Sequence, residues 1–254
     1  MRPVLTELFG IKIYSYGFMI ALGIIAAVML LNNRAKRQGY NEDKIFNMTM
    51  LAVVGGILGG KLLYIFTDIK HFLETPLTII TNFGEGFVVY GAIAGGALAV
   101  VFYCRKQKWE VLKVIDMIIP SVAIGQGFGR IGCFLAGCCY GAETTCPINV
   151  VFENSFYAPN GVHLHPTQLY SSVFNFLLAF LLLWYDKRKK KDGNTLALYL
   201  VVYSVGRFII EFFRDDPRGA VGLLSTSQFI AIFTFIIGVG IFFIHDRKRR
   251  EGIA

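Results

Sequence analysis

Charged side chains are scarce in this sequence. Asp, Glu, Lys and Arg make up 17% of the 254 residues, whereas hydrophobic residues make up 55% and 27 residues are glycine. Soluble domains carry about 25% charged residues, so the composition argues against an ordinary soluble domain. Abundant glycine is instead typical of helices that pack closely in a membrane.

The sequence also lacks the strict polar–apolar alternation that a transmembrane β-barrel requires. Its apolar residues form long runs, each able to cross a hydrocarbon core of about 30 Å at about 1.5 Å per residue. A single run could be a buried or re-entrant helix, but seven runs together favour spans. We therefore predict an all-α, polytopic membrane protein with seven transmembrane helices, at residues 14–31, 45–66, 87–103, 114–134, 168–185, 195–213 and 227–244.

The first run lacks the features of a cleaved signal peptide. Its basic flank, which includes Arg34 and Arg37, follows the apolar residues, whereas a signal peptide carries its positive charge in front. No small-residue cleavage site closes the run. We expect the mature protein to keep its N-terminus.

The net charge of +8 does not indicate nucleic-acid binding, because the basic residues gather at the ends of alternate runs. Lys and Arg concentrate in cytoplasmic loops of membrane proteins, so the pattern places the N-terminus outside and the C-terminus in the cytoplasm. These segments can also attract anionic head groups. They contain Arg34, Lys36, Arg37 and Lys44, then Arg105, Lys106, Lys108 and Lys113, then Lys187, Arg188, Lys189, Lys190 and Lys191, and finally Arg247, Lys248, Arg249 and Arg250.

Flexible linkers, low-complexity segments and inverted repeats are absent, so we predict a single integral membrane domain over residues 1–254. A long loop region at about 136–166 is expected on the outer face, with a short hairpin through 149–153. Such a loop either covers an active site or is an idle surface excursion. The glycine pairs within 55–60 and 91–96 predict close helix packing.

Several charged residues lie inside the apolar runs, where each costs about 2.5–3.5 kcal/mol and therefore needs a reason. Lys61, Arg130 and Arg207 outnumber Glu211 at these depths. Arg207 and Glu211 are spaced to pair on one helix face, or they line a polar cavity with Arg130 and Tyr203. A cationic cavity favours an anion, and guanidinium groups suit phosphate, so a phospholipid head group is the natural ligand. The glycines around Arg130 serve either helix packing or ligand access.

The order of these motifs resembles the prolipoprotein diacylglyceryl transferase family over about residues 10–245. That resemblance implies a seven-helix enzyme of the bacterial plasma (inner) membrane. It would transfer the sn-1,2-diacylglyceryl group of phosphatidylglycerol to the lipobox cysteine of a prolipoprotein, and release glycerol phosphate. The motifs are Tyr16-Gly17, Tyr90-Gly91, Gly129 to Phe134 with Gly137 and Gly141, His165 to Tyr170, and Tyr203, Arg207, Glu211 and Arg214.

The resemblance also implies roles for individual residues. Arg130 and Arg207 would hold the lipid phosphate, and the cavity would be formed with Tyr16, Tyr203, Glu211 and Gly141. The binding residues are further expected to include His165 and Lys61. The sequence departs from the family pattern where Tyr90 replaces a histidine, Cys133 an asparagine and Cys138 a glutamate.

The chemistry requires a thiolate to attack the glycerol carbon while the phosphate leaves with its charge neutralised, which Arg130 and Arg207 can do. Tyr90 is either the base or a packing residue, and Glu211 could orient Arg207. His165 lies at the outer edge, where it could only cap the fifth helix.

Cysteines near the outer face leave a disulfide open among Cys138, Cys139 and Cys146. The same three cysteines lack a convincing fourth metal ligand, so no metal and no cofactor are predicted. Cys133 is expected to be a small packing residue. Two other functions remain open for the chain, a membrane transporter and a lipid-binding paralogue without catalysis.

Overall fold

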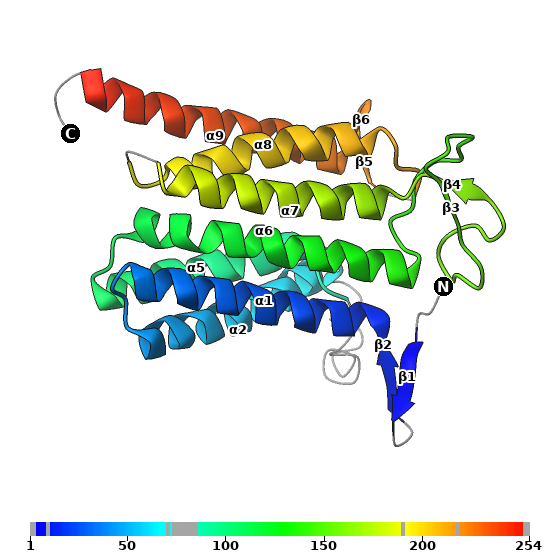
Figure 1. Cartoon of the computed structure of the whole chain (residues 1–254), viewed down its shortest axis with the longest axis horizontal. Helices are drawn as coiled ribbons and strands as arrows, with labels where there is room; N and C mark the ends of the chain where they lie inside the picture. Colours follow the sequence, from blue (N-terminus) through cyan, green and yellow to red (C-terminus); the bar gives the residue numbers. More distant parts are fainter. Residues whose placement is uncertain are drawn as a thin grey trace. The chain divides into compact units, whose positions relative to one another are not determined.

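The computed structural model describes residues 4–8, 11–69, 72, 86–188, 191–216 and 219–250, and its long elements are all helices (Figure 1). This confirms the all-α prediction, with most helices slightly longer than the apolar runs and α8 ending two residues earlier than its run. The helices are α1 (Ser15–Arg37), α2 (Glu42–Thr67), α5 (Val89–Gln107), α6 (Val111–Ala136), α7 (Thr167–Asp186), α8 (Asn194–Glu211) and α9 (Thr226–Arg250).

Six of these helices are long and apolar enough to cross a membrane, namely α1, α2, α6, α7, α8 and α9. The helix expected over 87–103 forms as α5, but its glycines and its basic last turn dilute its aliphatic residues. Large apolar side chains cover the outside of the helices, with 62% of Met29, 69% of Leu98 and 71% of Phe180 exposed. A surface of this kind requires lipid rather than water around it.

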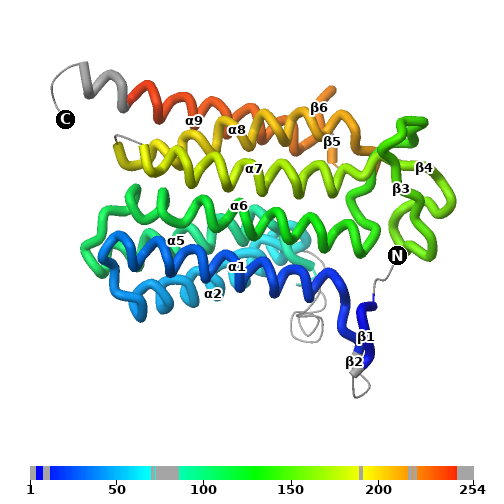
Figure 2. The backbone as a smooth tube through the Cα atoms, in the orientation of Figure 1, coloured from blue at the N-terminus to red at the C-terminus, as the bar shows by residue number. Residues whose placement is uncertain are grey.

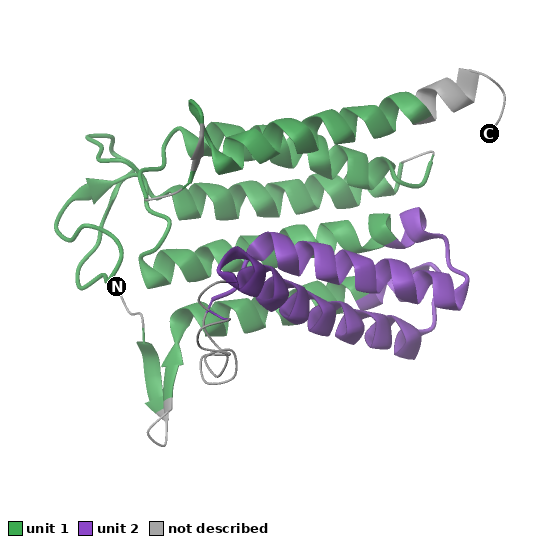
Figure 3. Ribbon diagram, turned by 180° about the vertical axis from the view of Figure 1, so that it is seen from behind, with its two compact units in different colours: residues 1–31, 115–254 green, residues 32–114 purple. Residues whose placement is uncertain are grey.

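The chain divides into two compact units, coloured separately in Figure 3. Unit 2 covers residues 32–114 and unit 1 covers residues 1–31 and 115–254. In unit 2, α2 packs along α5, and the glycines of the two helices face each other. A Cβ on Gly59 or Gly95 would collide with the backbone carbonyl of Gly91 or Gly55, respectively. The packing role predicted for these glycines is confirmed.

In unit 1, α7 packs on α8 and α8 on α9, and successive helices run in opposite directions (Figure 2). A buried cluster that includes Ala123, Leu178 and Tyr199 joins α6, α7 and α8. The Ser172 hydroxyl donates to the Gly127 carbonyl at 2.9 Å, and this contact fixes α7 against α6. The end of α6 and the start of α7 therefore lie together.

Three short hairpins join the elements of unit 1. The strands β3 (Val150–Val151) and β4 (His163–Leu164) pair within the loop between α6 and α7, where a hairpin was expected through 149–153. Phe152 is fully buried in that loop, so the loop has a small core of its own. The other two hairpins were not anticipated, and they pair β1 (Val4–Leu8) with β2 (Ile11–Tyr14), and β5 (Ala220–Val221) with β6 (Leu224–Ser225).

Asp116 is fully buried near the start of α6, where its carboxylate caps the first turn of α8. The backbone amides of Gly193 and Leu196 each donate to it at 2.8 Å. The first amides of a helix have no partner within the helix, and the positive end of the helix dipole favours an anion. Asp116 thereby joins two helices of unit 1 at the end where α8 begins.

Alanine at two adjacent glycines of α5 should have opposite effects. Gly95→Ala places a methyl group against the Gly55 carbonyl and should destabilise the protein by about 1–3 kcal/mol. Gly96→Ala meets only the Ala52 carbonyl at 3.4 Å and should stabilise the helix by up to about 1 kcal/mol. Thermal unfolding of both variants in detergent checks the difference, and equal midpoints would contradict the backbone contact.

Replacing Asp116 by alanine should destabilise unit 1, because two buried amides lose their acceptor. We expect a loss of about 2–4 kcal/mol of unfolding free energy. The exposed Asp43→Ala, in the first turn of α2, is the matched control and should cost less than about 1 kcal/mol. Denaturation in mixed micelles measures both variants.

Candidate functional site

The centre of the site is an ion pair on the last turns of α8. Arg207 Nη1 lies 2.7 Å from Glu211 Oε2, and Arg207 Nη2 donates to the Ser227 hydroxyl at 2.8 Å. The second carboxylate oxygen of Glu211 accepts from the Ser225 hydroxyl at 2.8 Å. Of the two arrangements that the spacing left open, the direct pair forms, and β6 and the start of α9 hold it in place.

Arg214 extends this network, although the sequence analysis gave it no role. Arg214 donates from Nε and Nη2 to the two carboxylate oxygens of Asp216, both at 3.0 Å, and its Nη1 lies 3.8 Å from Glu211. Only 5% of the Arg214 side chain is exposed. Its spacing of three residues from Glu211 was a signal for this contact.

Arg130 reaches the same region from α6. It is partly buried and interacts electrostatically with Tyr203, while Arg207 is repelled by both Arg214 and Arg130. Arg130 has no carboxylate partner among the residues that the structure describes. Within the described chain, the guanidinium groups of Arg130, Arg207 and Arg214 outnumber the two carboxylates of Glu211 and Asp216.

Two tyrosines predicted for the cavity lie beside these arginines. Tyr203 stacks on Tyr199 with ring centroids 5.2 Å apart, and the Tyr199 hydroxyl donates to Gln126 at 3.0 Å. Tyr16, in the first turn of α1, interacts electrostatically with Arg130 and is 43% exposed. A Cβ on Gly132 would lie 3.1 Å from the Tyr16 ring, so this ring packs closely on α6.

Gly141 and His165 lie where the loop after α6 meets the end of α8. Gly141 forms a bridge with Arg214, and a Cβ there would collide with the carbonyls of His165 and Phe213. The His165 ring contacts the Phe213 ring at 5.4 Å, and its Nδ1 lies 3.3 Å from the Tyr170 hydroxyl. His165 does not cap α7 with its side chain, because the N-cap residue is Pro166, which has no such bond.

Lys61 and Tyr90 belong to unit 2, so their part in the site stays a prediction. Lys61 is 4% exposed, and its ammonium group lies 5.3 Å from the centroid of the Tyr64 ring and 5.5 Å from that of Phe87. Tyr90 lies in the first turn of α5 and is 46% exposed.

The structure describes all five cysteines as free thiols and groups three of them. The sulfur atoms of Cys133, Cys138 and Cys139 lie within 4.8 Å of one another, and Arg130 interacts with all three. The disulfide that the sequence left open among Cys138, Cys139 and Cys146 does not form, and Cys146 is exposed and lies outside this group.

Neighbouring groups shift the pKa values of Cys138 and Cys139 in opposite directions. Hydrogen bonds from Cys133 and Cys138, together with the nearby Arg214 and Arg130, lower the pKa of Cys139 below its ordinary value. Hydrogen bonding to Cys133 and Cys139 raises the pKa of Cys138. The guanidinium groups of Arg130 and Arg214 therefore lie close enough to act on the Cys139 sulfur.

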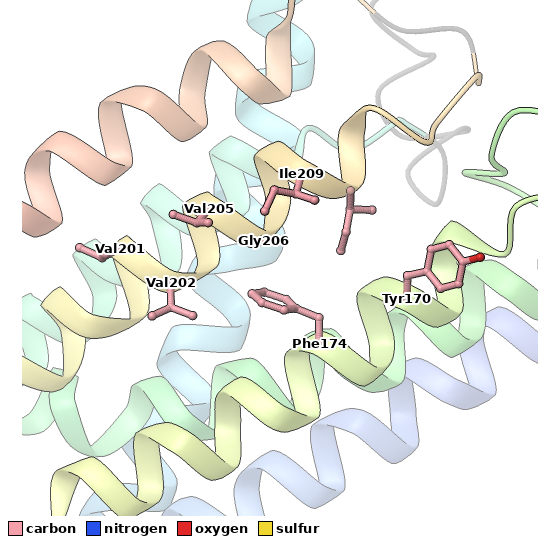
Figure 4. A pocket seen from close by; sticks show the side chains of 8 residues that line it. Tyr170, Phe174, Val201, Val202, Val205, Gly206 and Ile209 are labelled. Atoms are coloured by element: carbon pink, nitrogen blue, oxygen red, sulfur yellow. The ribbon is translucent and has the colours of Figure 1, made fainter.

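An apolar groove runs between α7 and α8 and passes the turn that carries Arg207 (Figure 4). Phe174 covers Gly206 there, where a Cβ would overlap the ring. Val205 and Ile209 form the α8 side of the groove. The groove is lined by apolar side chains and by Tyr170, and it follows the part of α8 whose backbone also carries Arg207.

Comparison with known proteins gives a consistent family. A model described as prolipoprotein diacylglyceryl transferase matches residues 3–244. The chain is 61% identical over 251 residues to the phosphatidylglycerol–prolipoprotein diacylglyceryl transferase of Clostridium tetani, covering 99% of this chain and 100% of the relative. It is 55% identical to phosphatidylglycerol–prolipoprotein diacylglyceryl transferase 2 of Clostridium perfringens (99% and 98% covered). A transferase of the same name from Clostridioides difficile is 30% identical, with 100% and 99% covered.

These matches span the helices, the loop after α6 and every residue of the charged cluster. The protein is a multi-pass bacterial membrane protein, because its helices can cross a membrane and its relatives are bacterial. The chain belongs to the prolipoprotein diacylglyceryl transferase family.

Proposed function

We propose that this chain transfers the sn-1,2-diacylglyceryl group of phosphatidylglycerol to the lipobox cysteine of a prolipoprotein. The products are a thioether-linked lipoprotein precursor and glycerol phosphate, which makes this the first step of lipoprotein maturation. The names of the similar proteins support the reaction, and the site must supply its chemistry.

The observation that carries the proposal is the excess positive charge of the buried cluster. Arg130 has no carboxylate partner within the described chain, and its charge adds to those of Arg207 and Arg214. The phosphodiester of phosphatidylglycerol carries one negative charge and balances this excess. At about 4 Å, each guanidinium–phosphate contact contributes roughly 4 kcal/mol in a partly buried site.

The same charges act on the reaction. The thiolate sulfur forms a bond to the glycerol carbon, and the carbon–oxygen bond breaks with its electron pair passing to the phosphate oxygen. Negative charge on the departing phosphate therefore rises, and Arg130 and Arg207 stabilise the transition state more than the ground state. Glu211 and Ser227 hold the Arg207 guanidinium in position, so little reorganisation is needed.

The groove between α7 and α8 binds one acyl chain of the lipid. It opens along the helix surface, and its walls are aliphatic and aromatic. A lipid can then enter sideways from the bilayer with its head toward Arg207. Gly141 and His165 form the wall of the head-group site on the side away from the groove. Tyr16 and Tyr203 complete that wall. We keep Lys61 and Tyr90 among the proposed site residues.

The chain crosses the membrane seven times as a single domain, with its N-terminus outside and its C-terminus in the cytoplasm. The connections rich in Lys and Arg then all lie in the cytoplasm. The charged cluster lies near the ends of α6 and α8 that face outward, under the loop at 136–166. A prolipoprotein emerging on that side presents its lipobox cysteine to the site.

Reporter fusions test the number of spans and their direction. Green fluorescent protein fused after Arg37, after Gln107 or at the C-terminus should fluoresce in cells, because each fusion point is cytoplasmic when α5 crosses the membrane. Alkaline phosphatase at the same points should be inactive. An active phosphatase after Gln107 combined with an inactive one after Arg37 would show that α5 does not cross.

Arginine substitutions test the site. Arg130→Ala and Arg207→Ala should each lower the rate of diacylglyceryl transfer to a lipobox peptide by about 10²–10³-fold, as expected for a lost charge-stabilising donor. Arg105→Ala is the control, since Arg105 is exposed in a basic connection. Release of glycerol phosphate from labelled phosphatidylglycerol measures the rate. Parent-level transfer by either variant would disprove the proposed mechanism.

A further inference from the structure

The three grouped thiols have no role in the transfer mechanism proposed above. The sulfur atoms of Cys133, Cys138 and Cys139 lie within 4.8 Å of one another and are partly buried. We propose that these cysteines bind one Zn²⁺ ion, and that the open fourth position of the ion takes the thiol of the incoming lipobox cysteine. The second half of this inference rests on the proposed function.

The end of α6 creates the first contact of this site. The amide of Gly137 donates to the Phe134 carbonyl at 3.2 Å, and that of Cys138 donates to the Cys133 carbonyl at 3.1 Å. With Gly137 at a φ of +77°, this is the Schellman motif, which brings the side chains on either side of the turn together. Cys133 and Cys138 occupy those two positions.

The third thiol is held by an unusual backbone. Cys139 has a φ of +59°, a left-handed conformation that costs a residue with a Cβ about 1–3 kcal/mol. Two buried side chains at the start of α7 fix the turn, because Thr167 donates to the Cys139 carbonyl at 2.9 Å and Gln168 donates to that of Cys138 at 2.8 Å. Simple packing of small side chains does not require this strain.

The dimensions suit zinc. A tetrahedral centre with Zn–S bonds of about 2.3 Å has sulfur atoms about 3.8 Å apart, so the thiols need to move by about 1 Å or less. Three thiolates and Zn²⁺ carry a net charge of −1, which the neighbouring Arg130 and Arg214 offset. Within the described part of the chain, the group holds three ligand atoms and no fourth.

An open fourth position is the mark of zinc sites that act on a substrate rather than stabilise a fold. The lipobox thiol has an ordinary pKa near 8.5, and coordination to zinc removes its proton to water. The bound sulfur then uses its lone pair to form the bond to the glycerol carbon, and the departing glycerol phosphate takes up a proton. No electron donor or acceptor is needed.

Metal content tests the site directly. The full chain is purified in detergent through a tag without histidine, and zinc is measured by mass spectrometry. The parent and Cys146→Ser should hold about one zinc per chain, whereas Cys133→Ser, Cys138→Ser and Cys139→Ser should hold far less. Thermal unfolding separates loss of the site from loss of the fold. A folded parent protein without zinc, or with copper instead, overturns the inference.

Cobalt substitution tests the fourth position without requiring turnover. The Co²⁺ protein should show tetrahedral thiolate absorption that changes when a lipobox peptide is added, and should not change with a peptide carrying serine at the lipobox cysteine. An unchanged spectrum with the cysteine peptide overturns substrate coordination.

Transfer rates separate the two proposals. The serine variants should transfer at least tenfold more slowly at neutral pH and recover partly above the thiol pKa of about 8.5. A parent that binds zinc but transfers nothing would sink the proposed function and the role of the fourth position, and would leave the zinc site itself standing. A parent that transfers without zinc, or serine variants at the parent rate, would sink the zinc site alone.

Discussion

The compensation of buried guanidinium charge governs this structure. Between residues 207 and 216, Arg207 pairs with Glu211 and Arg214 pairs with Asp216, so these four charges neutralise one another over a short stretch. Arg130 arrives from α6 without a carboxylate of its own in the described chain. A partly buried charge without a carboxylate partner is costly, so the site favours an anionic ligand. The positive charge is therefore a binding requirement rather than an accident of packing.

The same stretch explains why the loop after α6 must be ordered. The amide of Ala142 donates to the Phe213 carbonyl, and Gly141 has no room for a side chain there. The loop thus connects the end of α8 to the start of α7, and its small core around Phe152 keeps it folded. Because the arginines and the thiols depend on this junction, a substitution at Gly141 should disturb both groups together.

The long apolar runs predicted the seven long helices of the described chain, since runs of that length leave few alternatives. The spacing of Arg207 and Glu211 allowed their pairing as one of two arrangements, because residues four apart share a helix face. The sequence did not place Cys133 with Cys138 and Cys139, because that grouping depends on a left-handed turn at Cys139, a conformation that cysteine does not signal. Arg214 was missed because its main partner, Asp216, lies beyond the end of α8, where helical periodicity no longer applies.

The proximity of Arg130 to Cys133 gives the chemistry a geometric basis. The two residues lie three apart on α6, which separates them by about 4.5 Å along the helix axis and places them on one face. In the displacement, the attacking sulfur lies about 3–3.5 Å from the glycerol carbon, and the leaving oxygen is bonded to the opposite side of that carbon. Sulfur and oxygen are therefore about 4.5–5 Å apart. One turn of helix can therefore position the nucleophile through Cys133 and the leaving phosphate through Arg130. Flexible loops would not keep the sulfur and the oxygen at that spacing. A helix can, because it ends in a turn that Thr167 and Gln168 hold in place.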